Sequence, residues 1–150
     1  MWLEFDRPEV LVAHLGMSGQ FKIQSADSEY ERHLRANFQL SSGKELRFID
    51  QRTFGWLCVD QIKDDAPDIV SHIALDPFDS NFDKRKVVAE ISKRRSQIKK
   101  VILDQSIISG IGNIYADEAL WYAKIHPEAI SSELSSTQIL NILTAAQKVM

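Results

Sequence analysis

The spacing of apolar residues changes near residue 60, and this change constrains the fold more than any other feature. Before it, short apolar runs such as Val10–Ala13 occur between turn signals, and Ala36, Phe38 and Leu40 occupy alternate positions, as in half-buried β-strands. After residue 80, apolar residues recur at helical spacing, as over 139–149. Strands followed by helices predict an α+β fold, with antiparallel hairpins forming a partial β-sandwich lobe before a helical lobe.

The same pattern divides the 150 residues into three parts. We expect a β lobe over 1–60, a connection with two prolines over 61–80, and a helical lobe over 81–150. The length suits either one domain of ordinary size or two small lobes.

Four helices are predicted in the last part, over 81–94, 96–103, 113–124 and from 136 onward. We expect Ser80 or Asn81 to cap the first of these helices, and Ser96 to cap the second. Ser135, followed three residues later by Gln138, forms a capping box at the start of the last helix.

The composition is that of an ordinary soluble globular protein, with 44% apolar and 26% charged residues. Cys58 is the single cysteine, which excludes an internal disulfide and a four-cysteine zinc site. The sequence shows neither a secretory signal pattern at its start nor an apolar run long enough to span a membrane. We therefore expect a soluble, cytoplasmic monomer with no membrane partner and no metal ligands of its own.

Charge is distributed unevenly along the chain. The formal net charge is -3, yet the stretch 83–100 holds eight basic residues against two acidic ones. Such a basic block is typical of a contact with a polyanion, and equally of a solvated helix face. Because the chain as a whole lacks the basic character usual in nucleic-acid binders, any DNA contact must come from one face or from parts outside this chain.

A loop containing glycines opens directly into the helix predicted over 113–124. Gly110 and Gly112 allow close approach of the backbone, and the free amides of the next turn, beginning at Asn113, point to where an anion would sit. Tyr115 adds a hydroxyl donor in the same turn. These features predict a phosphate-binding loop, with a tight turn between two packed helices as the alternative.

Two further segments lie at loop tips between predicted strands. Met17 lies between Gly16 and Gly19, where it has little local core to join, although packing beneath the loop is the commoner fate of methionine. Arg52 and Phe54 are two residues apart and share one face of an extended stretch. A cation beside an aromatic ring can stack against nucleic-acid bases, but a surface arginine beside a core phenylalanine is the alternative.

Three segments, 14–21, 47–55 and 104–121, read HLGMSGQF, RFIDQRTFG and DQSIISGIGNIYADEALW. Together and in this order they resemble the formamidopyrimidine-DNA glycosylase family of bacterial DNA-repair enzymes, over nearly the whole chain. The first two motifs favour that branch over the related endonuclease VIII. The resemblance implies that 1–60 is the C-terminal half of the family's N-terminal β-sandwich domain, and that 81–150 contains a helix–two-turn–helix element that binds DNA.

The resemblance also implies roles for the loop residues. Met17, Arg52 and Phe54 match the three side chains that fill the gap left when a damaged nucleotide is flipped out of duplex DNA. An apolar wedge and an aromatic ring can replace lost stacking, and an arginine can pair with the widowed base. Glu118 lies in the third motif and is expected to be a buried or capping carboxylate.

Five more residues match family positions that face the DNA. Asn113 and Tyr115 match the phosphate-binding start of the helix–two-turn–helix, and Lys99 matches a lysine that contacts phosphate. His14 and His33 match DNA-facing positions in the β lobe. The implied partner is therefore damaged double-stranded DNA.

The family's catalytic residues are an N-terminal proline, whose amine attacks the sugar, and the glutamate that follows it. Here the first two residues are Met1 and Trp2, so we expect no catalytic residue in this chain. The resemblance implies the central part of an enzyme that excises 8-oxoguanine and formamidopyrimidines and cleaves the abasic site by β,δ-elimination. The 150 residues alone are then expected to be inactive, and the zinc of the family's zinc finger is expected beyond Met150, in the full-length protein.

Two alternatives stay open at this point. The chain is either a non-catalytic module that binds damaged DNA, or an unstable remnant. In a remnant, the edges and apolar faces of half a sandwich would lack the strands that should cover them.

Overall fold

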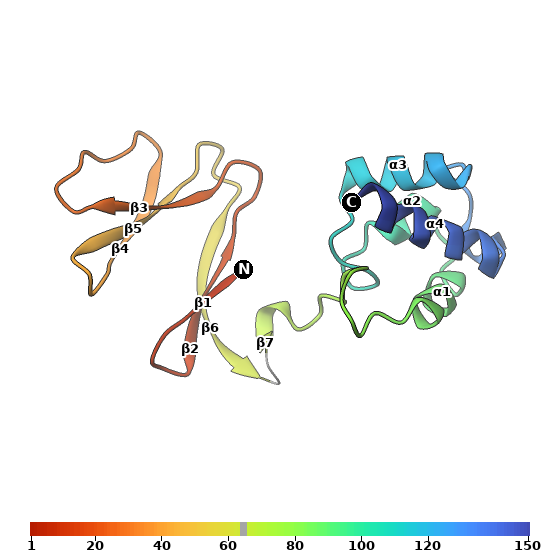
Figure 1. Ribbon diagram of the computed structural model, residues 1–150, viewed down its shortest axis with the longest axis horizontal. Helices are drawn as coiled ribbons and strands as arrows, with labels where there is room; N and C mark the ends of the chain where they lie inside the picture. Colours follow the sequence, from red (N-terminus) through yellow and green to blue (C-terminus); the bar gives the residue numbers. More distant parts are fainter. Residues whose placement is uncertain (64–65) are drawn as a thin grey trace. The chain divides into compact units, whose positions relative to one another are not determined.

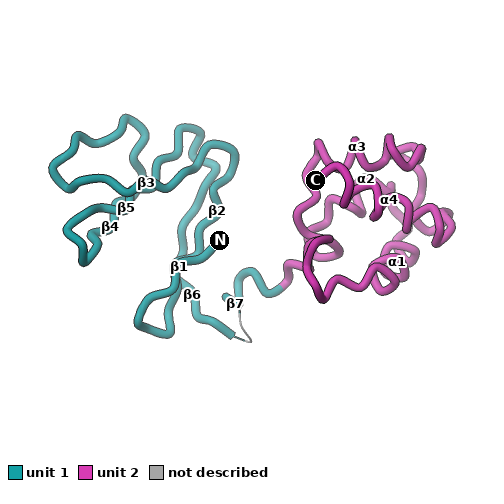
Figure 2. Tube along the Cα trace, viewed as in Figure 1, with its two compact units in different colours: residues 1–71 teal, residues 72–150 magenta. Residues whose placement is uncertain are grey.

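The computed structural model describes residues 1–63 and 66–150, and the chain forms two compact units, 1–71 and 72–150 (Figure 2). The boundary between the units falls within the connection expected over 61–80, of which residues 64 and 65 lie outside the described residues. The first unit is built from strands and the second from helices, which confirms the predicted α+β fold (Figure 1).

The first unit contains two antiparallel sheets. One has the strand order β1-β2-β6-β7, with β1 at Trp2–Glu4, β2 at Glu9–His14, β6 at Trp56–Lys63 and β7 at Ala66–Pro67. The other has the order β3-β5-β4, with β3 at Gln20–Ser25, β5 at Lys44–Ile49 and β4 at Leu34–Gln39. A short 3-10 helix, Asp68–Val70, follows β7. Strand β6 continues past residue 60, where the β lobe was expected to end.

The two sheets are joined by two loops that the strand pairing brings together. Loop 15–19 leads from β2 to β3, and loop 50–55 leads from β5 to β6. Before the first loop, His14 pairs with Trp56, which follows the second loop. Beyond it, Gln20 pairs with Ile49. Because both loops start and end on paired strands, they lie side by side.

Strand β5 has buried side chains on both of its faces, which a simple alternation of apolar and polar residues does not predict. On one face Phe48 is buried and Leu46 is partly buried. On the other face Glu45 and Arg47 are 2% and 0% exposed. The Arg47 guanidinium lies 2.9 Å from the Glu45 carboxylate and 3.3 Å from that of Glu31. Since a buried charge is tolerated only when it is paired, these contacts explain how a polar pair occupies a core position.

Arg47 also fixes the polar segment that follows β3. Its guanidinium donates to the backbone carbonyls of Ser25, Ser28 and Glu29 at 2.8 to 3.3 Å, and lies 4.7 Å from the centre of the Tyr30 ring. One buried side chain therefore satisfies the carbonyls of a loop that has little apolar content of its own.

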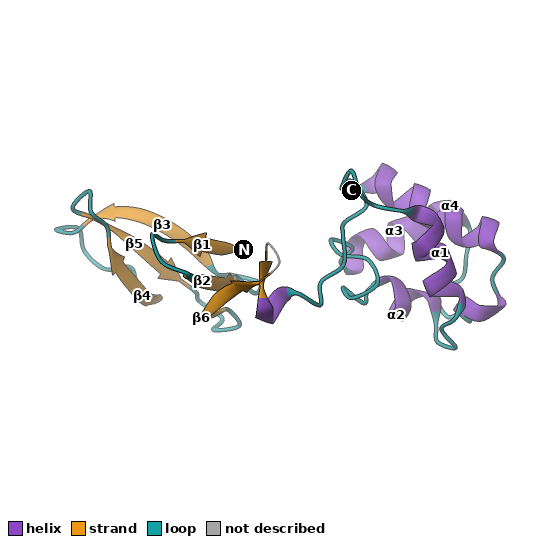
Figure 3. Cartoon of the chain, turned by 90° about the horizontal axis from the view of Figure 1, so that it is seen from below, coloured by secondary structure: helices purple, strands orange, loops and turns teal. Residues whose placement is uncertain are grey.

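The second unit packs four helices around a core of isoleucine, leucine, valine and alanine (Figure 3). The helices are α1 at Lys84–Ser92, α2 at Ile98–Ile102, α3 at Asn113–Ala123 and α4 at Ser136–Val149, with a 3-10 turn at Ser131–Glu133 before α4. The Ser135 hydroxyl accepts a bond from the Gln138 amide, and the Gln138 side chain accepts one from the Ser135 amide. The predicted capping box is thereby confirmed.

Two predicted helix starts were wrong. Helix α1 begins at Lys84 rather than near Ser80 or Asn81, because Asp83 is its cap and accepts hydrogen bonds from the amides of Arg85 and Lys86. The residues before it are held in turns: the side chain of Asp79, for example, accepts a bond from the Asn81 amide. Aspartate side chains favour such local turns over helix.

The second error concerns Ser96, which does not cap α2. The carbonyl of Ser96 accepts bonds from both the amide and the hydroxyl of Ser131, and α2 starts after Gln97 without a side-chain cap. The amides of Ile98 and Lys99 donate instead to the carbonyls of Ala129 and Pro127. Tertiary hydrogen bonds therefore replace the local cap that the sequence suggested. None of the helices described is long and apolar enough to cross a membrane.

Candidate nucleic-acid interface

The two loops between the sheets contact each other through their backbones. Gly16 has φ +59°, and a Cβ added to it would lie 2.8 Å from the Phe54 carbonyl carbon and 2.9 Å from the Gly55 nitrogen. A Cβ added to Gly55 would in turn lie 2.9 Å from the His14 carbonyl oxygen. Only glycine fits at these positions, so the glycines of both motifs serve to bring loop 15–19 and loop 50–55 into contact.

Three side chains project from these loops into solvent. Met17 is 73% exposed and Phe54 is 55% exposed, which excludes the alternatives in which they pack beneath the loop or in the core. The Arg52 guanidinium carbon lies 5.0 Å from the centre of the Phe54 ring, within the range of a cation–π contact. The structure therefore brings all three residues of the predicted gap-filling set to one pair of adjacent loops.

The carboxylate of Asp50 is fully buried and accepts hydrogen bonds from both loops. Its Oδ1 accepts bonds from the Ser18 hydroxyl at 2.5 Å and from the Arg52 amide at 3.2 Å, and its Oδ2 accepts one from the Gly55 amide at 2.7 Å. The Ser18 hydroxyl, and then the Gly55 amide, hold the pKa of Asp50 below its ordinary value, against the effect of burial. The carboxylate is thus stabilised in its charged form.

Asp50 and Ser18 lie within the sequence motifs, but neither was among the candidate site residues predicted from the sequence. Ser18 lies outside the strands, and Asp50 is in phase with Leu46 and Phe48 but polar, so the apolar pattern does not predict the burial of its side chain. The available signal was local: an aspartate at a strand end, two residues before Arg52 and five before Gly55, is well placed to accept bonds from turn amides.

The two predicted histidines lie at the same end of the β unit as these loops. His14 is exposed, stacks on Trp56 with ring centres 5.8 Å apart, and accepts a bond from the Gly16 amide at its Nδ1. His33 is partly buried, and its carbonyl accepts a bond from the Asp50 amide at 3.0 Å. Both positions therefore adjoin the loops that carry the exposed Met17 and Phe54.

In the helical unit, Gln105 shapes the glycine loop ahead of α3. Its side-chain amide donates to the carbonyls of Leu103 and Ile111 at 3.1 Å, and its side-chain oxygen accepts a bond from the Gly110 amide at 3.0 Å. Gly110 has φ +83°, a conformation that favours glycine. The sequence predicted a loop here but gave Gln105 no role. A glutamine that bonds to three backbone groups leaves no periodic signal in the sequence.

The start of α3 has the properties expected of an anion-binding turn. Its cap is Gly112, which has no side chain to occupy the first amides, and the amide of Ala116 is the first of the helix to bond back, to the Gly112 carbonyl. The amides of 113–115 are therefore available at the positive end of the helix dipole. Asn113 is exposed and Tyr115 is 37% exposed in the same turn.

Lys99 reaches this region from α2. Its Nζ lies 2.7 Å from Oδ1 of Asp117 in the second turn of α3, and its side chain is 31% exposed. Glu118 is exposed, and α3 starts at Gly112 without a side-chain cap, so the expectation of a buried or capping carboxylate at position 118 was wrong. Helix α3 turns the 118 position outward while Ala116, Ala119 and Leu120 enter the core.

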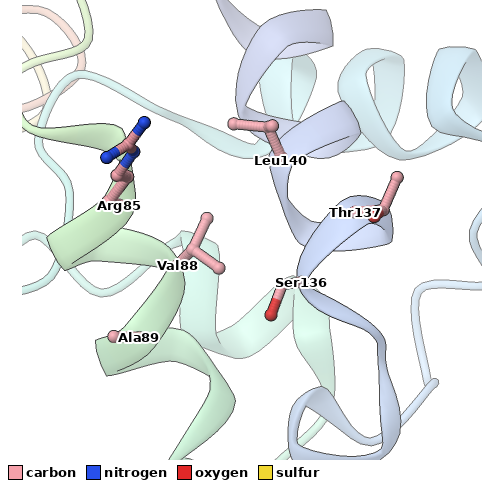
Figure 4. Close-up of a pocket in the computed structure, with 6 residues that line it drawn as sticks. All are labelled: Arg85, Val88, Ala89, Ser136, Thr137 and Leu140. Carbon is pink, nitrogen blue, oxygen red and sulfur yellow. The ribbon is translucent and has the colours of Figure 1, made fainter.

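The other basic residues of the stretch 83–100 are exposed, except for the partly buried Lys84, and some of them are paired. Lys93 and Arg94 both contact the Glu90 carboxylate, at 3.3 and 2.7 Å. A shallow hollow between α1 and α4 lies beside this stretch, and Figure 4 shows the guanidinium of Arg85 at its rim. Its lining residues are Arg85, Val88, Ala89, Ser136, Thr137 and Leu140. With a single ionisable side chain, the hollow offers no pair of groups for acid–base chemistry.

Within 1–63 and 66–150, no three histidine, cysteine, aspartate or glutamate side chains gather as a metal site would require, and Cys58 is a lone thiol. The described residues therefore do not fit the zinc of the family's zinc finger, and zinc has no part in the contacts proposed below.

Comparison with known proteins decides the family. The N-terminal domain of formamidopyrimidine-DNA glycosylase matches residues 1–57, and the H2TH domain of the same enzyme matches residues 73–150. The chain belongs to the formamidopyrimidine-DNA glycosylase family. This confirms the resemblance carried by the three sequence motifs.

Curated members of the family are similar along the whole chain. The formamidopyrimidine-DNA glycosylase of Thermobifida fusca is 45% identical over 163 residues, and that of Rhodococcus opacus is 49% identical over 155 residues. All of this chain is covered in both alignments, but only 55% and 54% of those relatives. The chain therefore spans about half the length of the curated relatives it matches.

Solved structures of the family have the same fold. The Lactococcus lactis enzyme bound non-covalently to DNA containing an abasic site has a TM-score of 0.82 at 26% identity, covering 99% of this chain and 57% of that one. A complex of MutM with DNA containing carbocyclic 8-oxo-G has a TM-score of 0.83 at 26% identity, covering 99% of this chain and 55% of the other. Members of the family are thus known in complex with damaged DNA.

Proposed function

We propose that this chain binds damaged double-stranded DNA and supplies the base-flipping and phosphate-binding parts of a glycosylase. The resemblance points to oxidised purines, such as 8-oxoguanine and formamidopyrimidines, as the excised bases, and to cleavage of the abasic site by β,δ-elimination. One observation carries the proposal: Met17, Arg52 and Phe54 project from two loops that contact each other, with Met17 73% and Phe54 55% exposed. Exposed apolar tips of this kind are typical of a contact surface.

The chemistry of these three residues suits an emptied base stack. Flipping a nucleotide costs a few kcal/mol in lost pairing and stacking. The Met17 side chain supplies an apolar wedge, and the Phe54 ring supplies a stacking face for the neighbouring base. The Arg52 guanidinium, already 5.0 Å from the Phe54 ring centre, supplies a planar set of donors for the widowed base.

A second group of residues suits the phosphate backbone. The uncapped first turn of α3 offers backbone amides, with Asn113 and Tyr115 as side-chain donors. Lys99 adds a positive charge beside the same helix. His14 and His33, which adjoin the loop pair, are proposed to face the backbone of the DNA near the lesion. Contacts of this kind give affinity without sequence preference, and they weaken as salt increases.

We expect the 150-residue polypeptide by itself to bind without cleaving. The resemblance assigns the nucleophile to an N-terminal proline and the acid–base role to the next glutamate, whereas this polypeptide starts with Met1 and Trp2. Borohydride trapping on an abasic duplex tests this expectation. No covalent adduct should form, and an adduct would show that another amine of the chain reaches the sugar.

Binding is tested by fluorescence anisotropy with two duplexes that differ at one position. One duplex carries a tetrahydrofuran abasic analogue, and the other is intact. The polypeptide should prefer the abasic duplex, because its gap is already open, and Met17→Ala should reduce that preference about tenfold at unchanged affinity for the intact duplex. Equal affinity of the unaltered polypeptide for both duplexes would contradict the proposal.

A further inference from the structure

Asp50 is the point at which the segments of the β unit that carry Met17, Arg52 and Phe54 meet. Its side chain accepts bonds from Ser18 on loop 15–19, and from the amides of Arg52 and Gly55 on loop 50–55. Its backbone amide donates to the carbonyl of His33, and its carbonyl accepts a bond from Arg35 Nε at 2.9 Å. One residue therefore contacts both loops and the start of β4.

The two contacts to the loops depend on each other. The Ser18 hydroxyl donates to the carboxylate of Asp50 and also accepts a bond from the Arg52 amide at 3.0 Å. Ser18 thus connects the loop that carries Met17 to the backbone of Arg52. A carboxylate only accepts hydrogen bonds, and the bonds to Ser18, Arg52 and Gly55 occupy both of its oxygens.

Contacts between the backbones leave the loops little room to shift independently. Gly16 lies against the Phe54 and Gly55 backbone with no space for a Cβ. A Cβ on Gly55 would lie 2.7 Å from the Phe48 ring and 3.1 Å from the Asp50 carboxylate. With Asp50 in place, the tips of the two loops are held in one arrangement.

We propose that Asp50 is a positioning residue that holds loop 15–19 and loop 50–55 as one unit, so that Met17, Arg52 and Phe54 enter the DNA gap together. The inference rests on the proposed function for its consequence in DNA binding, but its structural part stands by itself. Side chains that are fixed before binding lose less conformational freedom on binding. Loosening the loops should therefore lower the preference for a gapped base stack rather than the general affinity for DNA.

Two substitutions test the link, and a third provides a matched control. Asp50→Asn replaces one accepting oxygen with a donor, and Ser18→Ala removes only the connection to the first loop. Asp60→Asn is the control, because Asp60 also accepts bonds from two backbone amides, those of Gln61 and Ile69, but near the opposite end of β6 from Trp56. The control should leave both loops unchanged.

The first measurement needs no DNA. The chain has three methionines, Met1, Met17 and Met150, so methyl-labelled methionine gives three NMR signals. Asp50→Asn and Ser18→Ala should both move the Met17 signal towards that of an unfolded chain. Met1 beside β1 and Met150 against the helical core should keep their signals, which reports that both units stay folded.

An unchanged Met17 signal in both variants would overturn the proposal. If Asp50→Asn also removes the Met1 signal from its folded position, that variant has unfolded the β unit, and Ser18→Ala then decides. A Met17 signal that moves in Asp60→Asn as well would also contradict the proposal, because any lost carboxylate would then have the same effect.

The second measurement compares affinities for the abasic-analogue duplex and the intact duplex. Asp50→Asn should lower the preference for the abasic duplex about tenfold, with the intact-duplex affinity within about twofold of the unaltered chain. Equal losses on both duplexes would contradict a positioning role. If the unaltered chain shows no preference at all, the proposed function fails, while the Met17 signal still decides whether Asp50 couples the loops.

Discussion

The ammonium group of Lys99 lies 2.7 Å from the carboxylate of Asp117, so the lysine proposed to contact phosphate is already paired within the protein. Asp117 is 58% exposed and Lys99 31% exposed, which makes this an accessible ion pair of modest strength. DNA must compete with Asp117 for the lysine. The ion pair therefore reduces the contribution of Lys99 to the affinity for DNA.

Removing the competing carboxylate should tighten DNA binding. Asp117→Asn is expected to raise the affinity for an intact duplex about threefold at low salt, since exposed pairs contribute about 0.2–1 kcal/mol and the added net positive charge favours binding. Lys99→Met should weaken binding to all duplexes and lower the slope of log affinity against log salt by about 1. Anisotropy titrations at several salt concentrations measure both effects. Weaker binding by Asp117→Asn would show that the carboxylate holds Lys99 in place for the DNA.

The stacked pair of Arg52 and Phe54 predicts that lysine cannot replace arginine. Arg52→Lys keeps the charge but loses the planar set of donors and the stacking surface. We expect about a three- to tenfold loss of preference for the abasic duplex, with little change on the intact duplex. Arg95→Lys, at an exposed position of the basic stretch, is the matched control. If the two variants behave alike, the guanidinium of Arg52 has no role beyond its charge.

Acid should loosen the loop pair, because protonation of Asp50 weakens the hydrogen bonds that its carboxylate accepts. Hydrogen bonds from Ser18, Gly55 and Arg52 hold the pKa of folded Asp50 below its ordinary value, so the carboxylate stabilises the folded state at pH values above about 4. That contribution is lost as the pH falls from about 4 through the lower, folded pKa. Urea unfolding of the β unit between pH 7 and pH 3 should show this loss, and Asp50→Asn should reduce it. An identical pH profile in the variant would contradict the assignment.

The buried pair of Arg47 and Glu45 predicts an asymmetry between single and double substitution. Arg47→Met leaves the Glu45 carboxylate buried without its partner and frees the carbonyls of the segment 25–30, so it should strongly lower the free energy of unfolding. Adding Glu45→Gln should recover part of the loss. Urea unfolding followed by circular dichroism measures both variants. A double variant less stable than Arg47→Met would show that the pair is not the cause.

Much of this architecture was accessible from the sequence. Alternation in the first 60 residues predicted the strands, and the Ser135–Gln138 capping box correctly placed the start of α4. The position of Met17 between Gly16 and Gly19 left both exposure and packing beneath the loop open, and only the structure shows that the side chain is exposed. The strands and the capping box depend on residues that are close together in the sequence, so the sequence alone can indicate them.

The interactions that organise the site were not accessible in the same way. Asp50 reaches Ser18 across 32 residues of sequence, and Ser131 reaches Ser96 across 35. Arg47 is a buried cation at a strand position where alternation with Leu46 and Phe48 predicts an exposed side chain. Such long-range hydrogen bonds leave no periodic trace, and they override local preferences such as the cap expected at Ser96.

The central claim is that this chain fills an emptied base stack. It is tested most directly with a duplex that carries 2-aminopurine opposite a tetrahydrofuran abasic analogue. Binding of the chain should change the 2-aminopurine emission, because Phe54 stacks and Arg52 pairs at that position. The triple variant Met17→Ala, Arg52→Ala and Phe54→Ala should bind through its phosphate contacts without that change. An equal emission change in the triple variant, or none with the unaltered chain at saturation, would contradict the account.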